Sequence, residues 1–235
     1  MRSDTRSRLE RSLDNPIWAC LATRHAHFAL GDVRARRYRP DISPLTGLAG
    51  DGEDVAARLA DTVQIGDDVS IFGPAVPALG SSWDVLREAR ITQMIRRDEA
   101  PLDEADIDAV TLDATDIAEM LQLVELTQPG PFRPRTIELG TYIGIRDAGR
   151  LVAMAGERMW IGPYREVSAV CTHPDVRARG YARALIGRVV NRMLRAAQIP
   201  FLHVYSANTR AIDVYSTLGF VCRAEFPLLH ARRLS

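Results

Sequence analysis

The segment that most constrains the fold is REVSAVCTHPDVRARGYARAL, residues 165–185. It reads as a strand that ends at Thr172, a turn that contains proline, and a helix that begins after Gly180. Gly180 can adopt backbone conformations closed to other residues, and the small Ala182 lets a ligand approach the main chain. Backbone N–H groups at such a turn, with the positive end of the helix, bind phosphate or pyrophosphate. We therefore predict an anion-binding turn over Arg177–Arg183, where arginine side chains add positive charge.

The segments around this turn predict a mixed fold. Strands are predicted at 108–112, 141–147, 150–160, 165–172, 199–205, 220–226 and 228–232, and helices at 115–127, 136–139, 181–198 and 209–218. This order, βααβββαβαββ, predicts an α+β fold whose sheet is antiparallel early and gains a parallel pair late.

A second pattern, HVYSANTRAIDVYSTLGF, follows at residues 203–220. Asn208 can cap a helix, and Tyr215 lies two helical turns further along on the same face. Taken alone, Asn208 is equally compatible with a simple cap and Tyr215 with an amphipathic core residue.

Together, the two patterns resemble the GNAT N-acetyltransferase superfamily. In that superfamily R/Q-x-x-G-x-G/A opens the helix that binds the pyrophosphate of acetyl-CoA, and N-x6-Y…LGF follows downstream. Ala182 stands at the last position of the first motif, which accommodates alanine, and the resemblance covers Ile107 to Arg232, closest to the FR47-like branch. It implies a mixed, mostly antiparallel twisted sheet flanked by helices, acetyl-CoA as co-substrate and a primary amine as acetyl acceptor.

The resemblance also implies the residues that hold acetyl-CoA. Three strand residues would hold the pantetheine arm and the thioester carbonyl through their backbone, the turn would wrap the pyrophosphate, and Asn208 would contact the arm. The implied set is Val170, Cys171, Thr172, Arg177, Ala178, Arg179, Gly180, Tyr181, Ala182, Arg183 and Asn208. Tyr215 would be the general acid that protonates the departing thiolate, and its phenol needs close positioning because its ordinary pKa of about 10 exceeds that of a thiol.

Two residues are candidates for the base that deprotonates the amine. Glu166 lies at the position where histone-acetylating members of the superfamily place their base, and His203 lies where ribosomal-protein acetyltransferases carry a glutamate. An imidazole with a pKa near 6.5 suits a base. We favour Glu166, and the alternatives for it are a solvated carboxylate on a strand or a carboxylate that pairs with Arg165 or Arg158.

The chain divides at a charged segment, IRRDEAPLDEADID, that reads as a linker. We expect an N-terminal α/β region over 1–100 and the catalytic region over 101–235. The first region lacks a second R-x-x-G-x-G/A turn, so it is interpreted as an extension, or as a degenerate half of the same fold that narrows the acceptor cleft. The stiff loop Pro129–Pro134 is the best candidate for a specificity element.

Composition excludes several other functions. All 30 basic residues are arginine, which removes enzymes that need a lysine, such as those with a Schiff base, a Walker-type phosphate loop or a kinase site. The net charge of zero argues against nucleic-acid binding, and His25 and His27 lack companions that would complete a metal site. No apolar run reaches membrane-spanning length, and three unpaired cysteines fit a reducing compartment, so we expect a cytoplasmic protein.

The predicted function is transfer of an acetyl group from acetyl-CoA to a small-molecule or peptide amine, by direct attack of the amine on the thioester. No nucleic acid or membrane partner is expected, and a homodimer is compatible with the family. The alternative is a non-catalytic acyl-CoA-binding or sensor protein, which would need the Arg177–Ala182 turn but neither Tyr215 nor Glu166.

Overall fold

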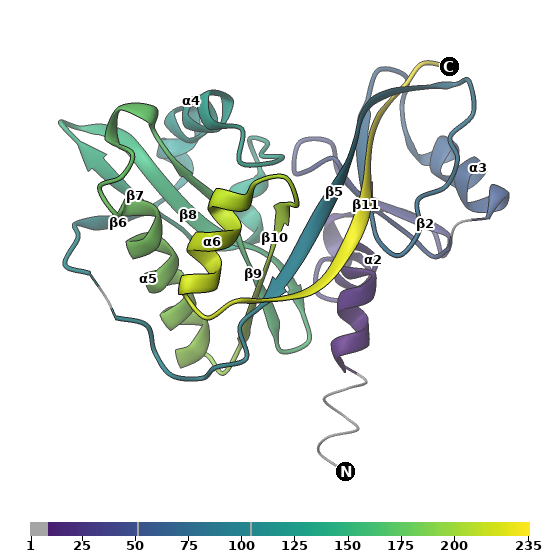
Figure 1. The fold of residues 1–235 in the computed structure, drawn as a ribbon. Coiled ribbons are helices and arrows are strands. Elements are labelled where there is room, and N and C mark those ends of the chain that lie inside the picture. The colour runs from purple at the N-terminus through teal and green to yellow at the C-terminus, as the bar shows by residue number, and fades with distance from the viewer. Residues whose placement is uncertain (1–8, 51, 104) are drawn as a thin grey trace, which may run out of the picture.

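The computed structural model describes residues 9–50, 52–103 and 105–235, so the polar start of the chain lies outside the described residues. The strands form one eleven-stranded sheet in the order β1-β2-β3-β4-β11-β5-β10-β9-β8-β7-β6 (Figure 1). They are β1 (Ala29–Gly31), β2 (Ala35–Tyr38), β3 (Leu45–Leu48), β4 (Asp68–Phe72), β5 (Trp83–Ile95), β6 (Ala109–Leu112), β7 (Tyr142–Asp147), β8 (Arg150–Ile161), β9 (Tyr164–Thr172), β10 (Ile199–Tyr205) and β11 (Val221–Arg233). The α-helices are α2 (Pro16–Leu21), α3 (Glu53–Thr62), α4 (Ile117–Thr127), α5 (Tyr181–Arg195) and α6 (Thr209–Thr217).

The C-terminal half has the predicted arrangement. Strands β6 to β9 pair with one another in antiparallel fashion, and β9 and β10 are parallel neighbours connected through α5. A parallel pair requires such a crossover, because a tight turn can join only antiparallel strands. The α+β fold with a mostly antiparallel sheet flanked by helices is confirmed.

Helices pack on both sides of this part of the sheet (Figure 1). Helices α5 and α6 share a hydrophobic cluster with strand residues such as Val167 and Leu202, while α4 shares a second cluster with Tyr142 and Phe132. Because apolar side chains on both faces of β8 are covered, nearly the whole strand is buried. This position agrees with the apolar run LVAMAG at residues 151–156 of its sequence.

Two long strands join the halves of the chain (Figure 1). Strand β5, from the N-terminal region, lies between β10 and β11, with Gln93 opposite His203 and Met94 opposite Cys222. Strand β11, from the C-terminal end, lies between β5 and β4, with His230 opposite Ser70. Each half also contains one parallel pair bridged by a helix, β3–α3–β4 and β9–α5–β10. The strand order is thus nearly symmetrical about β5 and β11, with four further strands on the β11 side and five on the β5 side, and each half contributes its last long strand to the other.

The N-terminal region differs in detail from expectation. The apolar segment from Trp18 to Leu30, whose periodicity does not distinguish a strand from a buried helix, begins in α2, ends in β1 and has a turn between them. Strands β2 and β3 were not predicted, because both are four residues long and tertiary pairing places them. At Gly47 an added Cβ would lie 2.4 Å from the backbone nitrogen of Trp18, so β3 needs glycine for α2 to approach.

The two closing strands predicted near the C-terminus are one continuous strand, β11, that runs through Pro227. Register shifts at Cys222/Ala224 and His230/Ala231 let this strand bend while it stays paired to β5. In the described part of the chain, no helix is long and apolar enough to cross a membrane.

Candidate active site

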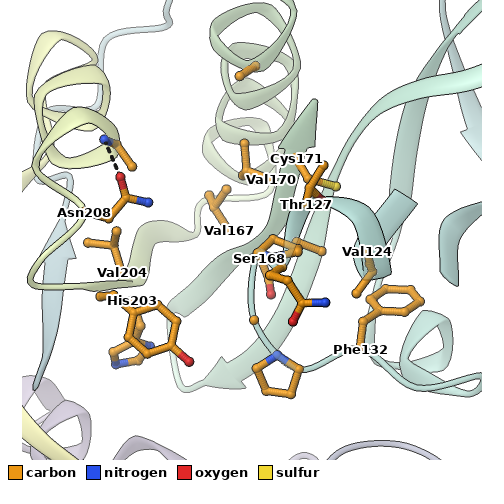
Figure 2. Close-up of a pocket in the computed structure, with 18 of the residues that line it drawn as sticks. Val124, Thr127, Phe132, Val167, Ser168, Val170, Cys171, His203, Val204 and Asn208 are labelled. Atoms are coloured by element: carbon orange, nitrogen blue, oxygen red, sulfur yellow. Dashed lines mark hydrogen bonds between the residues drawn. The ribbon is translucent and has the colours of Figure 1, made fainter. Parts of the chain in front are cut away.

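A cleft of about 1050 Å³ lies where β9 and β10 separate. The two strands pair only over Tyr164–Val167 and Ile199–Leu202. Further along, Val170 lies on one side of the cleft and Val204 and Asn208 lie on the other (Figure 2). The separation leaves one edge of β9 unpaired and open to a ligand, as an added strand would need.

A β-bulge interrupts β9 beside the cleft. Met154 and Gly156 of β8 lie opposite Cys171 and Ser168, so β9 has one more residue than β8 over this stretch. Ala169 takes up the extra residue with a φ of 51°, in the left-handed region. A bulge turns backbone N–H groups out of the regular ladder, where they can donate to a bound carbonyl oxygen.

The predicted anion-binding turn opens on the same cleft. Ala178 and Gly180 have positive φ values of 64° and 80°, and α5 begins directly afterwards. The N–H groups in the first turn of α5 have no intrahelical acceptor, and no side chain of the described residues caps them. An added Cβ at Gly180 would have no atom within 4 Å, so the turn borders open space. These features fit a phosphate at the start of the helix.

A buried ion pair lies beneath the separation point of the two strands. The carboxylate of Glu166 is completely buried, and Nε and Nη2 of Arg158 each donate to one of its oxygens at 2.8 Å. The backbone N–H of Met159 also donates to it, at 3.3 Å. Although burial alone would raise the pKa of Glu166, the adjacent Arg158 guanidinium outweighs burial and holds that pKa well below its usual range.

The second candidate base, His203, contacts the first. Its Nδ1 lies 2.7 Å from Oε1 of Glu166, and its Nε2 lies 3.0 Å from Nε2 of Gln93. Gln93 also donates to the carbonyl of Leu13 and accepts from Arg223, which fixes its amide nitrogen toward His203. Burial lowers the pKa of His203 despite the contact with Glu166. The imidazole is therefore neutral at pH 7, with both nitrogens engaged.

Tyr215 and Asn208 come to the cleft from α6. The Asn208 side chain accepts from the backbone N–H of Ala211 at 3.2 Å, so it caps α6 as well as lining the cleft (Figure 2). The ring of Tyr215 packs edge-on against Phe220, with centroids 6.0 Å apart. Burial raises the pKa of Tyr215 to about 12, and a smaller contribution comes from Cys171 on β9. Tyr215 therefore keeps its proton at physiological pH.

The other end of the cleft, here called the acceptor end, is closed by the N-terminal half. It is lined by Asp68, Ser70 and Phe72 of β4, Arg87 and Ile91 of β5, Leu228 and His230 of β11, and residues 129–133 of the predicted specificity loop. Both Asp68 oxygens accept from Nη2 of Arg133, at 2.7 and 2.8 Å, which ties the loop to β4. The ring centroid of Phe72 lies 4.7 Å from that of His203. The acceptor end therefore reaches the point where β9 and β10 separate.

Most of the predicted site residues line this one cleft. They are Val170, Cys171, Thr172, Arg177, Ala178, Gly180, Tyr181, Ala182, Arg183, His203, Asn208 and Tyr215. Glu166 lies beneath it, and Arg179 pairs with Asp147 at 3.6 Å on the protein surface. The Oγ1 atom of Thr172 is buried and has no hydrogen-bond partner among the described residues. Sequence reasoning missed the acceptor-end residues of β4, β5 and β11, because nothing in those strands signals that they converge on the cleft.

Comparison with known proteins identifies the family. The FR47-like protein model matches residues 142–226. A crystal structure from Novosphingobium aromaticivorans, assigned to the GNAT family of acetyltransferases, is 34% identical in sequence, with coverage of 95% of this chain and 99% of its own, and a TM-score of 0.87. This chain belongs to the GNAT family. The resemblance seen in the two motifs is confirmed, including its FR47-like character.

More distant structures share the GNAT fold over nearly the whole chain. A GCN5-related N-acetyltransferase from Kribbella flavida is 13% identical, covers 94% of this chain and 96% of its own, and has a TM-score of 0.62. A GCN5-related N-acetyltransferase-like protein from Streptococcus suis is also 13% identical, with 97% and 98% covered and a TM-score of 0.60. No curated protein sequence matches the chain. At the level of the family, the GNAT fold supports acyl-CoA-dependent acetyl transfer, and the shared architecture includes the N-terminal half.

Proposed function

We propose that this GNAT protein is an acetyl-CoA-dependent N-acetyltransferase that acts on a primary amine by direct attack on the thioester. The observation that carries the proposal is the convergence of three features on one cleft. These are the unpaired, bulged edge of β9, the uncapped start of α5, and the protonated phenol of Tyr215. A sensor protein would need the first two but not the third.

The residues present fit acetyl-CoA. The α5 turn offers N–H groups and nearby arginines to a pyrophosphate, and the β9 edge offers backbone groups to an extended amide arm. The unpartnered Oγ1 of Thr172 adds a hydrogen-bonding group on that edge. When bound there, acetyl-CoA would supply an activated acyl carbon and a thiolate leaving group.

The chain's own residues then stabilise the two charges that develop. Backbone N–H groups at the bulge around Ala169 would donate to the carbonyl oxygen as it becomes negative. Tyr215 would donate its phenol proton to the departing sulfur. Because the pKa of Tyr215 is raised to about 12, well above that of a thiol, positioning rather than acidity would govern this transfer.

Glu166 and His203 are arranged differently from a single catalytic base that contacts the substrate. Glu166 lies beneath the cleft with both oxygens hydrogen-bonded, and it is linked to the cleft through His203 and Arg158, which both line it. A carboxylate with a strongly depressed pKa is also a weak proton acceptor. We propose that Glu166 and His203 act together, and that Glu166 fixes the His203 ring at the point where β9 and β10 separate. That either residue takes the amine proton stays a prediction.

We further propose that residues 1–100 are a degenerate half of the same fold and that residues 101–235 contain the catalytic region. The nearly symmetrical strand order about β5 and β11 supports this proposal. In the N-terminal half, α3 begins with the acidic residues Glu53 and Asp54, whereas the turn before α5 contains Arg177 and Arg179. Acidic side chains there would repel pyrophosphate, so this half would shape the acceptor end rather than bind a second acetyl-CoA.

A thiol-release screen tests the function. The wild-type protein is incubated with acetyl-CoA and single amines, namely butylamine, spermidine, γ-aminobutyrate, alanine and an alanine peptide. We expect amine-dependent release of thiol and an N-acetylated product by mass spectrometry. Since the chain contains no lysine, self-acetylation of side-chain amines cannot contribute to the background. Binding of acetyl-CoA by calorimetry without any acetylated product would support the sensor alternative instead.

Replacement of Gly180 tests the anion-binding turn. Gly180→Val places a β-branched residue at a φ of 80°, a conformation that costs about 1–3 kcal/mol for such side chains. We expect about tenfold weaker binding of acetyl-CoA by calorimetry, because the strained turn displaces the N–H groups. The matched control is Gly66→Val, at a φ of 90° and with equally open surroundings, but outside the cleft. Equal affinities for the two variants would contradict the assignment of the turn.

A further inference from the structure

The acceptor end of the cleft contains three arginines with different surroundings. Arg158 is buried and bound to Glu166, and Arg133 is bound to Asp68. Arg87 is exposed on β5 and makes no ion pair or hydrogen bond with its side chain among the described residues. Two of the three positive charges are thus neutralised within the protein, and the charge of Arg87 is left for a ligand.

Arg87 is nevertheless held in place. Its guanidinium carbon lies 5.5 Å from the ring centroid of Tyr205, which also lines the cleft. Stacking on an aromatic face fixes the guanidinium plane and leaves its N–H edge available, the geometry that binds carboxylates with two hydrogen bonds. A solvated surface arginine without such a contact would lose more side-chain entropy on binding.

Polar neighbours of Arg87 come from β11, which pairs with β5, and from β4 on the other side of β11. His230 of β11 lies opposite Arg87 of β5 on one side and Ser70 of β4 on the other. Its Nδ1 lies 2.8 Å from the Ser70 hydroxyl. Its Nε2 lies 3.5 Å from Asp68, whose charge is shared with Arg133. Burial lowers the pKa of His230, Asp68 partly offsets this, and the guanidinium groups of Arg133 and Arg87 lower it further. A bound anion would reverse the effect of these two cations.

From this arrangement we propose, as an extension of the proposed function, that the acetyl acceptor is an amine that also carries a carboxylate. Arg87 binds that carboxylate, and His230 and Ser70 lie beside it as hydrogen-bonding groups; these three residues are called the carboxylate subsite. Buried apolar side chains, Phe72, Ile91 and Leu228, surround the subsite and suit the carbon chain between the two polar groups. The acceptor is thus a small amino acid or short peptide, held at its acidic end.

The opposite wall is consistent with an ammonium group. Glu125 of α4 lines the cleft, and its carboxylate has no hydrogen-bond or ion-pair partner among the described residues. Helix α4 packs on β9, the strand whose bulge faces the predicted thioester position. An ammonium near Glu125 and a carboxylate at Arg87 would orient a dipolar acceptor with its amine toward the reacting carbon.

Matched amines test the subsite by activity. We expect the wild-type kcat/KM for γ-aminobutyrate and alanine to exceed that for butylamine and alaninamide by about tenfold or more, as for a hydrogen bond to a charged group. Arg87→Gln should abolish this preference, by lowering kcat/KM for γ-aminobutyrate and alanine to the level of butylamine and alaninamide. Arg233→Gln is the matched control, because Arg233 is likewise stacked on an aromatic ring, 5.3 Å from the centroid of Trp83, outside the cleft.

A second measurement does not depend on turnover. The imidazole signals of the five histidines are followed by NMR as pH varies, with His230 assigned from the His230→Gln variant. Addition of γ-aminobutyrate should raise the pKa of His230 in the wild-type protein and in Arg233→Gln, because an anion beside the ring stabilises its charged form. Butylamine should leave it unchanged, and so should γ-aminobutyrate with Arg87→Gln.

The outcomes separate the two proposals. If butylamine and alaninamide are acetylated as well as their carboxylated partners, and γ-aminobutyrate does not move the His230 titration, the subsite is refuted while the acetyltransferase function stands. If no amine is acetylated but γ-aminobutyrate raises the His230 pKa through Arg87, the function is refuted and the subsite stands. A response to inorganic phosphate alone would overturn the assignment to a carboxylate.

Discussion

Tyr215→Phe is expected to lower kcat by about 10²–10⁴-fold, the usual contribution of a positioned general acid. Phenylalanine keeps the edge-on packing against Phe220, so only the proton donor is lost. The affinity for acetyl-CoA and the melting temperature should stay within experimental error. Steady-state kinetics with the best amine of the thiol-release screen, together with calorimetry and thermal unfolding, give the three quantities.

The pH dependence of this defect provides an independent check. With a pKa of about 12, Tyr215 stays protonated up to pH 10, so the ratio of wild-type to variant kcat should be constant from pH 6 to 10. A ratio that falls with rising pH in this range would mean that the group lost in the variant titrates there. Unchanged turnover of Tyr215→Phe would remove the proposed role, and the thiolate would then leave without this donor.

Glu166→Ala is expected to destabilise the protein by about 3–5 kcal/mol, because it leaves the buried guanidinium of Arg158 without its carboxylate. The matched double variant, Glu166→Ala with Arg158→Met, removes both charges and should regain most of the lost free energy of unfolding. Denaturant unfolding measures both. Additive losses in the double variant would contradict the view that an orphaned buried charge is the cause.

The same pair predicts how stability depends on pH. Since the folded-state pKa of Glu166 lies below the ordinary 4.5, its contribution is complete above that value and declines as pH falls toward the folded pKa. The difference in unfolding free energy between the wild type and Glu166→Ala should therefore be constant near neutrality and shrink below about pH 4.5. If the difference in unfolding free energy grew as the pH fell, the folded-state pKa of Glu166 would be raised rather than lowered.

How far the sequence could predict this fold depended on where the determining contacts lie. The elements from β7 to α6 could be predicted because local signals coincide with them, such as the turn at Gly180 and the cap at Asn208. Strands β2 and β3 could not, because four residues provide too little periodicity and their pairing partners are remote. The position of β5 between β10 and β11 has no local signal at all.

The site also contains residues that could be predicted from the sequence and residues that could not. Residues of the cofactor-binding turn could be proposed because one contiguous segment contains them. The pairing of Glu166 with Arg158 could be proposed from their neighbouring strands, but the contact of Glu166 with His203 depends on the parallel register of β9 and β10. The carboxylate subsite combines β4, β5 and β11, strands that lie up to 160 residues apart in the chain, as for Ser70 and His230. Such a group becomes visible only when the strand order is known.

The strand order also has a consequence for biosynthesis. During translation, β4 and β5 emerge well before β11, which pairs with both and includes residues up to Arg233. The edges of β4 and β5 that β11 covers must therefore remain unpaired until this later strand has been synthesised. Unpaired strand edges invite association with other chains, so a nascent chain stalled before β11 should be a target for chaperones. A fragment of residues 101–235 would meet the reverse problem, since it would lack β5 between β10 and β11.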